Sequence, residues 1–129
     1  MTPTVAEHLA IYDQVDIALD TIPRTGGSTT AEALWMDVPV ITLAGERFIE
    51  RLSATMLSTV GLNELITHSQ KDFMACAAAL AQDTERRNTL RTSLRQRMAV
   101  SLCDAASFVR ILEHAYHTMW QHSLIPTTR

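Results

Sequence analysis

A short run of small and hydroxylated residues, Gly26 to Thr30, has the composition of an anion-binding turn. Gly26 and Gly27 come first, and we expect a helix to begin near Ser28. The first turn of a helix carries unpaired N–H groups and the positive end of the macrodipole, which together attract phosphate. Glycine lets an anion approach the backbone closely. From spacing alone, an ordinary capped helix start explains the run equally well, because GxGxxG spacing and a Lys-Ser/Thr ending are both absent.

Three further side chains lie where they could act with this turn. Glu32 falls one turn inside the expected helix, where it either interacts favourably with the helix dipole or accepts hydrogen bonds from sugar hydroxyls. Arg24, in the loop before the glycines, either offers a planar fork to an anion or is simply solvated. His8 precedes the first expected strand and is either a surface or capping histidine or a residue near the ligand.

The residues on both sides of the turn predict a β-α-β unit that positions these groups. Val15, Ile17 and Leu19 alternate with polar residues, as expected for the end of a buried strand. The β-branched run over residues 38–43 fits the next parallel strand. Ligands of such sheets bind at the carboxyl ends of the strands, so the candidate site lies at the end of the first strand.

The other elements are expected to be mostly helical. A helix over residues 4–12 has a capping box formed by Thr4 and Glu7. Ile49, Leu52, Met56 and Val60 predict a helix that ends at Gly61, residues 62–67 predict a short third strand, and later helices begin near Ser69, Asp83 and Asp104. The last helix carries a regular apolar stripe of Phe108, Ile111, Leu112, Ala115 and Met119.

The helix that follows Asp83 separates its apolar and basic residues. Leu90, Leu94 and Met98 are expected to face the core. The arginines expected largely outside are Arg86, Arg87, Arg91, Arg95 and Arg97. We interpret this arginine group as a solvated helix face in preference to a binding patch.

Composition indicates one globular domain and excludes several functions. The chain has 129 residues, 47% of them hydrophobic, and a net charge of −3, which gives no reason to expect nucleic-acid or anionic-membrane binding. Residues 1–14 lack the basic and apolar regions of a signal peptide, and no apolar run approaches a membrane span. Cys76 and Cys103 have no metal-ligand spacing and suggest a reducing cytoplasm, and the scattered histidines predict no metal centre.

Residues 16–54, DIALDTIPRTGGSTTAEALWMDVPVITLAGERFIERLSA, resemble the carboxyl-terminal catalytic lobe of the O-GlcNAc transferase family, which includes SPINDLY-like and bacterial members. The positions that match the family pattern are Asp16, Leu19, Asp20, Thr21, Pro23, Gly26, Ser28, Thr29, Glu32, Leu34, Trp35, Pro39, Val40, Thr42, Gly45, Glu46 and Arg51. Residues 101–120 resemble the family's final helices, ending in the same Tyr-x-x-Met-Trp. The resemblance extends from about His8 to Trp120.

The resemblance implies an α/β fold, the Rossmann-like carboxyl-terminal lobe of a GT-B glycosyltransferase, with a short parallel sheet and a helical carboxyl-terminal half. We expect this lobe to occupy residues 1–122 and residues 123–129 to form a frayed tail. The family transfers N-acetylglucosamine or a related sugar from a UDP-sugar to Ser or Thr hydroxyls of proteins, with inversion and without a required metal. The UDP-sugar is thus the implied donor substrate, a protein is the implied acceptor, and no cofactor is expected.

Family residues carry over to specific positions of this chain. His8 matches a histidine near the uridine, and Glu32 matches an acidic residue on the ribose. The implied donor-binding set is His8, Gly26, Gly27, Ser28, Thr29 and Glu32, of which Gly27, Ser28 and Thr29 match the diphosphate cradle. The chain departs from the pattern at Val5, which occupies about the place of a nucleotide-binding lysine, and at Gly27, where the animal enzymes have histidine.

The family's amino-terminal lobe, its catalytic histidine and lysine, and its TPR repeats are expected upstream of Met1. The chain then resembles the last third of a catalytic region: a truncated reading frame, a mis-called start or half of a split enzyme. We expect no transfer without the other lobe, and exposed apolar surface that leads to marginal stability or self-association. The alternative is a non-catalytic remnant or interaction module that keeps the fold without binding a donor.

Overall fold

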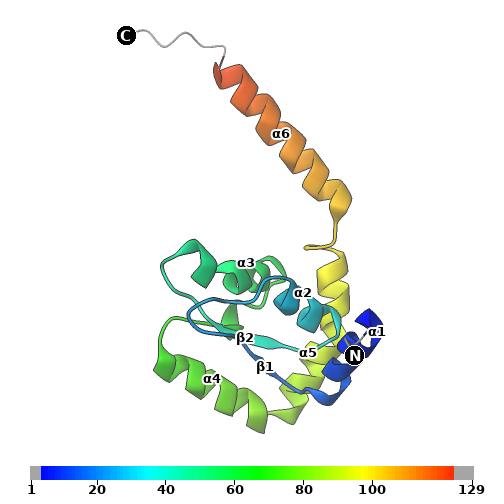
Figure 1. Ribbon diagram of the computed structural model, residues 1–129, viewed down its shortest axis with the longest axis vertical. Helices are drawn as coiled ribbons and strands as arrows, with labels where there is room; N and C mark the ends of the chain where they lie inside the picture. Colours follow the sequence, from blue (N-terminus) through cyan, green and yellow to red (C-terminus); the bar gives the residue numbers. More distant parts are fainter. Residues whose placement is uncertain (1–3, 124–129) are drawn as a thin grey trace.

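The computed structural model describes residues 4–123 and shows a small parallel sheet with helices on both faces (Figure 1). The strands, in spatial order, are β1 (Ala18–Leu19), β2 (Val40–Leu43) and β3 (Ile66–Thr67). Ala18 is opposite Val40 in the first ladder, and Thr42 is opposite Ile66 in the second. The expected α/β, Rossmann-like lobe with a short parallel sheet is confirmed.

The helices cover the sheet and continue beyond it. In chain order they are α1 (Val5–Ala10), η1 (Ile11–Gln14), α2 (Ser28–Trp35), η2 (Phe48–Glu50), α3 (Leu52–Thr59), η3 (Asn63–Leu65), α4 (Gln70–Gln82), α5 (Thr84–Ala99) and α6 (Ala105–Ser123). Helices α2 and α3 lie on one side of the sheet and α4 on the other, and all three contact β2 (Figure 1). Helix α5 contacts both α2 and α4, which closes the core at one end.

The core lies around the central strand. Its fully buried residues include Leu34 of α2, Ile41 of β2 and Leu57 of α3. Helix α5 contributes Leu90, Leu94 and Met98, as its spacing predicts. The central strand is buried along most of its length because helices cover both faces, which is the usual situation of a parallel strand.

The first strand is shorter than predicted. The ladder begins at Ala18, and the preceding residues 15–17 form no strand. Val15 and Ile17 pack against the core as expected, but Leu19 is 57% exposed, so its predicted burial is wrong. The physical reason is that β1 is an edge strand paired with β2 alone among the described residues.

The predicted helix over residues 49–60 also differs in the structure. A short 3-10 turn, η2, comes first, and α3 begins only at Leu52. The Glu50 side chain accepts a hydrogen bond from the Arg47 N–H at 3.1 Å, which stabilises the 3-10 turn that precedes the longer helix. The buried residues of α3 are Ser53, Ala54 and Leu57, whereas Ile49 is exposed. Gly61 ends the segment with a φ of 74°, as expected for a left-handed cap.

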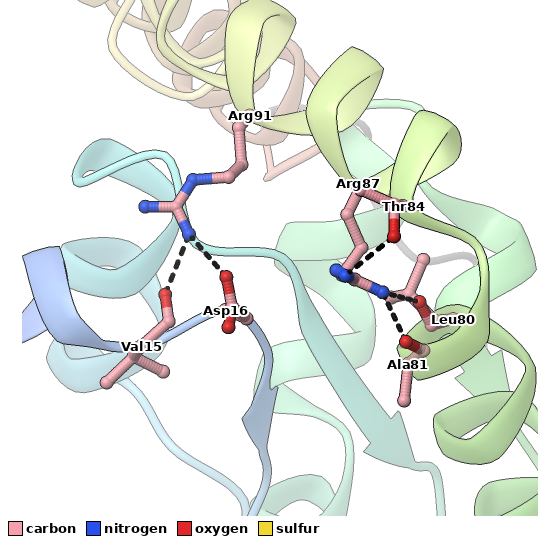
Figure 2. Close-up of polar contacts among 7 residues, drawn as sticks. All are labelled: Val15, Asp16, Leu80, Ala81, Thr84, Arg87 and Arg91. Atoms are coloured by element: carbon pink, nitrogen blue, oxygen red, sulfur yellow. Dashed lines mark hydrogen bonds and ion pairs between the residues drawn. The ribbon is translucent and has the colours of Figure 1, made fainter.

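None of the five arginines of α5 is buried, as predicted, but four of them also donate hydrogen bonds to carbonyls of other segments, which a solvated face does not describe. Arg91 Nη1 donates to the Val15 carbonyl at 2.9 Å and lies 3.6 Å from Asp16 Oδ1 (Figure 2). Arg87 donates to the last carbonyls of α4, including that of Leu80 at 2.9 Å (Figure 2). Arginine's several donors let one side chain satisfy groups from separate elements.

The last helix, α6, projects away from the rest of the domain (Figure 1). Asp104 accepts a hydrogen bond from the Ser107 N–H at 3.0 Å, which confirms the predicted cap. No residue of α6 is buried, and the apolar residues Phe108, Ile111 and Met119 are all exposed. Of the expected frayed tail, Ser123 belongs to α6 and residues 124–129 lie outside the described residues.

Candidate functional site

The glycine turn and the start of α2 form an open, polar helix terminus. Helix α2 begins at Ser28, as predicted, and Gly27 is its N-cap residue. No side chain among the described residues caps this terminus. Ser28 and Thr29 are exposed in its first turn, while Thr30 is buried. The terminus therefore presents backbone donors and two hydroxyls to solvent, at the positive end of the helix dipole.

The carboxylate of Asp20 anchors the glycine turn through hydrogen bonds, a role that was not predicted from the sequence. Its Oδ1 accepts from the Gly26 N–H at 2.8 Å and from the Thr21 N–H at 2.9 Å. Its Oδ2 accepts from the Thr42 hydroxyl, on the neighbouring strand, at 2.7 Å. One carboxylate thus joins the end of β1, the glycine turn and β2. The available signal was an acidic residue placed directly after an apolar strand and six residues before a glycine.

The two glycines of the turn have different surroundings. A Cβ atom on Gly26 would overlap the hydroxyl oxygen of Thr30 and would lie 2.8 Å from that of Thr29. A Cβ atom on Gly27 would meet nothing within 4 Å. Gly26 is therefore required by packing within the protein, whereas the space in front of Gly27 is open to a ligand.

A buried hydroxyl network supports the turn from the side of α3. Ser53 Oγ donates to the Gly26 carbonyl at 3.0 Å and lies 2.8 Å from Thr30 Oγ1. Thr25 donates to the Ile49 carbonyl at 2.9 Å. These contacts explain why a serine is buried in α3.

The predicted residues His8 and Glu32 meet beside the same terminus. His8 Nε2 lies 3.3 Å from Glu32 Oε2, and both side chains are partly exposed. Tyr12, which the sequence interpretation did not include, donates its hydroxyl to the Thr29 carbonyl at 3.3 Å and packs edge-on against the His8 ring. Burial, with a smaller contribution from the charge of Glu32, raises the pKa of Tyr12, which keeps the phenol protonated as a donor.

A cavity of about 280 Å³ adjoins this terminus and is lined by Tyr12, Leu19, Asp20 and Thr29, among others. Of the six predicted donor-binding residues, Thr29 lines this cavity, Gly26, Gly27 and Ser28 precede it in the same turn, and His8 and Glu32 contact each other beside it. Arg24 is exposed in the loop before the glycines, as expected for the interpretation that it is solvated. Arg51 lies elsewhere, on a larger cavity of about 470 Å³ between α3 and β3.

The described residues offer neither a metal cluster nor a membrane helix. Within residues 4–123, no group of three or more His, Cys, Asp and Glu side chains is placed to hold a metal ion. In the same range, no helix combines the length and the apolar character needed to cross a membrane. Cys76 and Cys103 are both free thiols, and burial raises the pKa of Cys76.

Comparison with protein families and curated proteins gives a consistent result. The model of the family described as "Glycosyl transferase family 41" matches residues 3–112. A relative from Petunia hybrida, described as "Probable UDP-N-acetylglucosamine--peptide N-acetylglucosaminyltransferase SPINDLY", is 40% identical over 116 residues. A relative from Arabidopsis thaliana, with the same description ending in SEC, is 31% identical over 117 residues. Each alignment covers 89% of this chain and only 12% of the relative.

A solved structure agrees with the sequence matches. A mutant O-GlcNAc transferase from Thermobaculum terrenum superposes with a TM-score of 0.85 at 39% identity. The match covers 94% of this chain and 23% of that one. The chain therefore spans only a small part of the proteins that it resembles.

Proposed function

Because this chain belongs to glycosyl transferase family 41, we propose that it is the donor-binding lobe of a UDP-sugar glycosyltransferase. The observation that carries the proposal is the uncapped start of α2, with open space over Gly27 and Glu32 one turn along. The names of its relatives, which specify transfer of N-acetylglucosamine from its UDP derivative to peptides, support this donor class.

In the proposed site, the diphosphate of the UDP-sugar lies at the α2 terminus. It accepts hydrogen bonds from the backbone N–H groups and hydroxyls of Ser28 and Thr29, and Gly27 allows it to approach the main chain. Asp20 and Ser53 contribute by holding the turn in place before the ligand arrives. When the sugar leaves, negative charge develops on UDP, and these fixed donors stabilise it without reorganising.

The nucleoside end of the donor is proposed to lie toward α1. The carboxylate of Glu32 accepts hydrogen bonds from the ribose hydroxyls, and His8 lies near the uracil. Tyr12 positions this region through its hydrogen bond to the Thr29 carbonyl. The contact between His8 and Glu32 supports this arrangement because it keeps both side chains beside the helix terminus before the nucleotide binds.

The remaining steps of transfer are proposed to need parts of the family that this chain does not span. The catalytic residues, the second lobe of the GT-B arrangement and the site for the acceptor Ser or Thr belong to that remainder. We further propose inverting transfer without a metal, and a cytoplasmic location, in accord with the family resemblance and the two free cysteines.

Titration of the purified chain with UDP in a calorimeter tests the proposal. We expect saturable binding, weakened roughly 10- to 100-fold by Glu32→Ala, which removes a charged hydrogen-bond acceptor. Ser28→Ala should weaken binding less, because its backbone donor remains. Glu85→Ala, at an exposed position in the first turn of α5, is the matched control and should leave affinity unchanged. A folded chain that fails to bind millimolar UDP would instead be a remnant or an interaction module.

A further inference from the structure

A second cavity lies along α3 and shares no lining residue with the cavity at the glycine turn. Its volume is about 470 Å³, within the usual range for small-molecule sites. Ala54 and Ile66 supply apolar surface, while Arg51, Ser58, Asn63 and His68 supply polar groups. Ala44 and His68, which directly follow β2 and β3, place one end of the cavity at the edge where parallel sheets bind their ligands, and Asn63 places the other end before β3.

The charges around this cavity favour an anionic ligand. The chain as a whole is acidic, yet the cavity lining contains one arginine, one histidine and no carboxylate. Within residues 4–123, Arg51 forms no ion pair, whereas the nearby acids Glu50 and Glu64 are paired with Arg47 and Arg86. A guanidinium that faces a cavity without a protein partner is suited to bind phosphate through two parallel hydrogen bonds.

The uncharged groups favour a ligand that also carries hydroxyls. The hydroxyls of Thr55 and Thr59 donate to main-chain carbonyls of their own helix, at 3.0 and 2.9 Å, which leaves their lone pairs free to accept. Ser58 and Asn63 can both donate and accept. Such a set matches the alternating donors and acceptors of a polyol, and the small apolar side chains match the C–H face of a sugar ring.

We propose that this cavity binds a phosphorylated monosaccharide, with its phosphate on Arg51 and its hydroxyls on Ser58 and Asn63. His68 lies at the boundary with a neighbouring cavity of about 330 Å³, so the ligand has room to extend across the ends of the strands. The site is separate from the α2 terminus and does not depend on the function proposed for that terminus.

The test is titration of the folded chain with glucose 6-phosphate, followed by amide chemical shifts in NMR spectra. Inorganic phosphate and glucose are titrated separately as controls, because each represents one half of glucose 6-phosphate. We expect saturable shifts around Ser58, Asn63 and His68 with glucose 6-phosphate, and affinity at least tenfold weaker for either half. Arg51→Gln should weaken binding at least tenfold, while Arg110→Gln, which removes the same charge from the remote helix α6, should not.

Several results would overturn the proposal. Equal affinity for phosphate and glucose 6-phosphate would mean that the cavity holds an anion without recognising a sugar. Shifts confined to the α2 terminus, or an unchanged affinity after Arg51→Gln, would place the ligand elsewhere. The thermal melting temperature of Arg51→Gln shows whether that variant is folded. The UDP titration reports on the other site, so failure of one proposal is distinguishable from failure of the other.

Discussion

His8 Nε2 lies 3.3 Å from Glu32 Oε2, and this contact joins α1 to α2 across 24 positions of sequence. The side chains of His8 and Glu32 are 48% and 36% exposed, so water screens their interaction. The pair therefore contributes little to the stability of the domain. Its consequence is positional, because it holds α1 beside the terminus at which we propose that the nucleotide binds.

A double-mutant cycle measures this contact. We expect a coupling free energy of about 0.2–1 kcal/mol between His8→Ala and Glu32→Ala in urea denaturation, the usual range for an exposed ion pair. Combining His8→Ala with Glu85→Ala should give additive changes, since the only ion pair that His8 makes among the described residues is with Glu32. Zero coupling in the first cycle would show that the pair is not maintained in solution.

The two glycines of the turn should respond in opposite ways to alanine. Gly26→Ala should lower the free energy of unfolding by about 1–3 kcal/mol, because the new methyl group overlaps buried and packed hydroxyls. Gly27→Ala should change it by less than about 0.5 kcal/mol but reduce UDP affinity roughly tenfold, by filling the space proposed for the diphosphate. Unchanged affinity in a stable Gly27→Ala variant would argue against a ligand at this position.

Asp20 should be among the most sensitive polar positions of the domain. Asp20→Ala should lower the free energy of unfolding by about 2–4 kcal/mol, since it leaves the Gly26 N–H and the Thr42 hydroxyl without their acceptor. Asp16→Ala is the matched control and should cost less than about 1 kcal/mol, because that carboxylate makes one exposed ion pair. Equal effects in urea denaturation would contradict the anchoring role.

The stability of the first turn of α6 should depend on pH, because the carboxylate of Asp104 caps it. The side chain and backbone of Ser107 hydrogen-bond to this carboxylate and lower its pKa. A lowered pKa in the folded state means that the cap is fully effective above the ordinary aspartate value of about 4, and that its contribution falls as pH decreases. The protection factor of the Ser107 amide, which compares its hydrogen exchange with the intrinsic exchange rate at the same pH, should therefore fall on acidification. Asp104→Asn, which keeps a capping oxygen without titrating, should remove this dependence.

The apolar stripe of α6 should make the isolated chain self-associate. Ile111 and Met119 are 70% and 65% exposed, and burial of such residues between molecules is favourable. Sedimentation velocity should show a concentration-dependent increase in mass, which the double substitution Ile111→Ser and Met119→Ser abolishes. Met74→Ser, at an exposed apolar position of α4, should not abolish it. A chain that stays monomeric at high concentration would contradict this expectation.

The sequence by itself determined those parts of the structure that depend on residues close together along the chain. The glycine turn, the caps at Thr4 and Asp104 and the buried face of α5 were all predicted, because hydrogen bonds and side-chain spacing within one element set them. The identity of the family was also evident from the sequence, since it rests on matched residues. These features position the candidate site at the start of α2.

Only the tertiary structure decided which residues from distant segments meet. The roles of Asp20 and Tyr12 depend on partners in other elements, and no local pattern encodes such partners. The exposure of Leu19 follows from the place of β1 at the sheet edge, and that of α6 from its projection beyond the core. The sequence predicts a solvated face for the arginines of α5 because their partners, such as the carbonyl of Val15, belong to other segments that only folding brings within range.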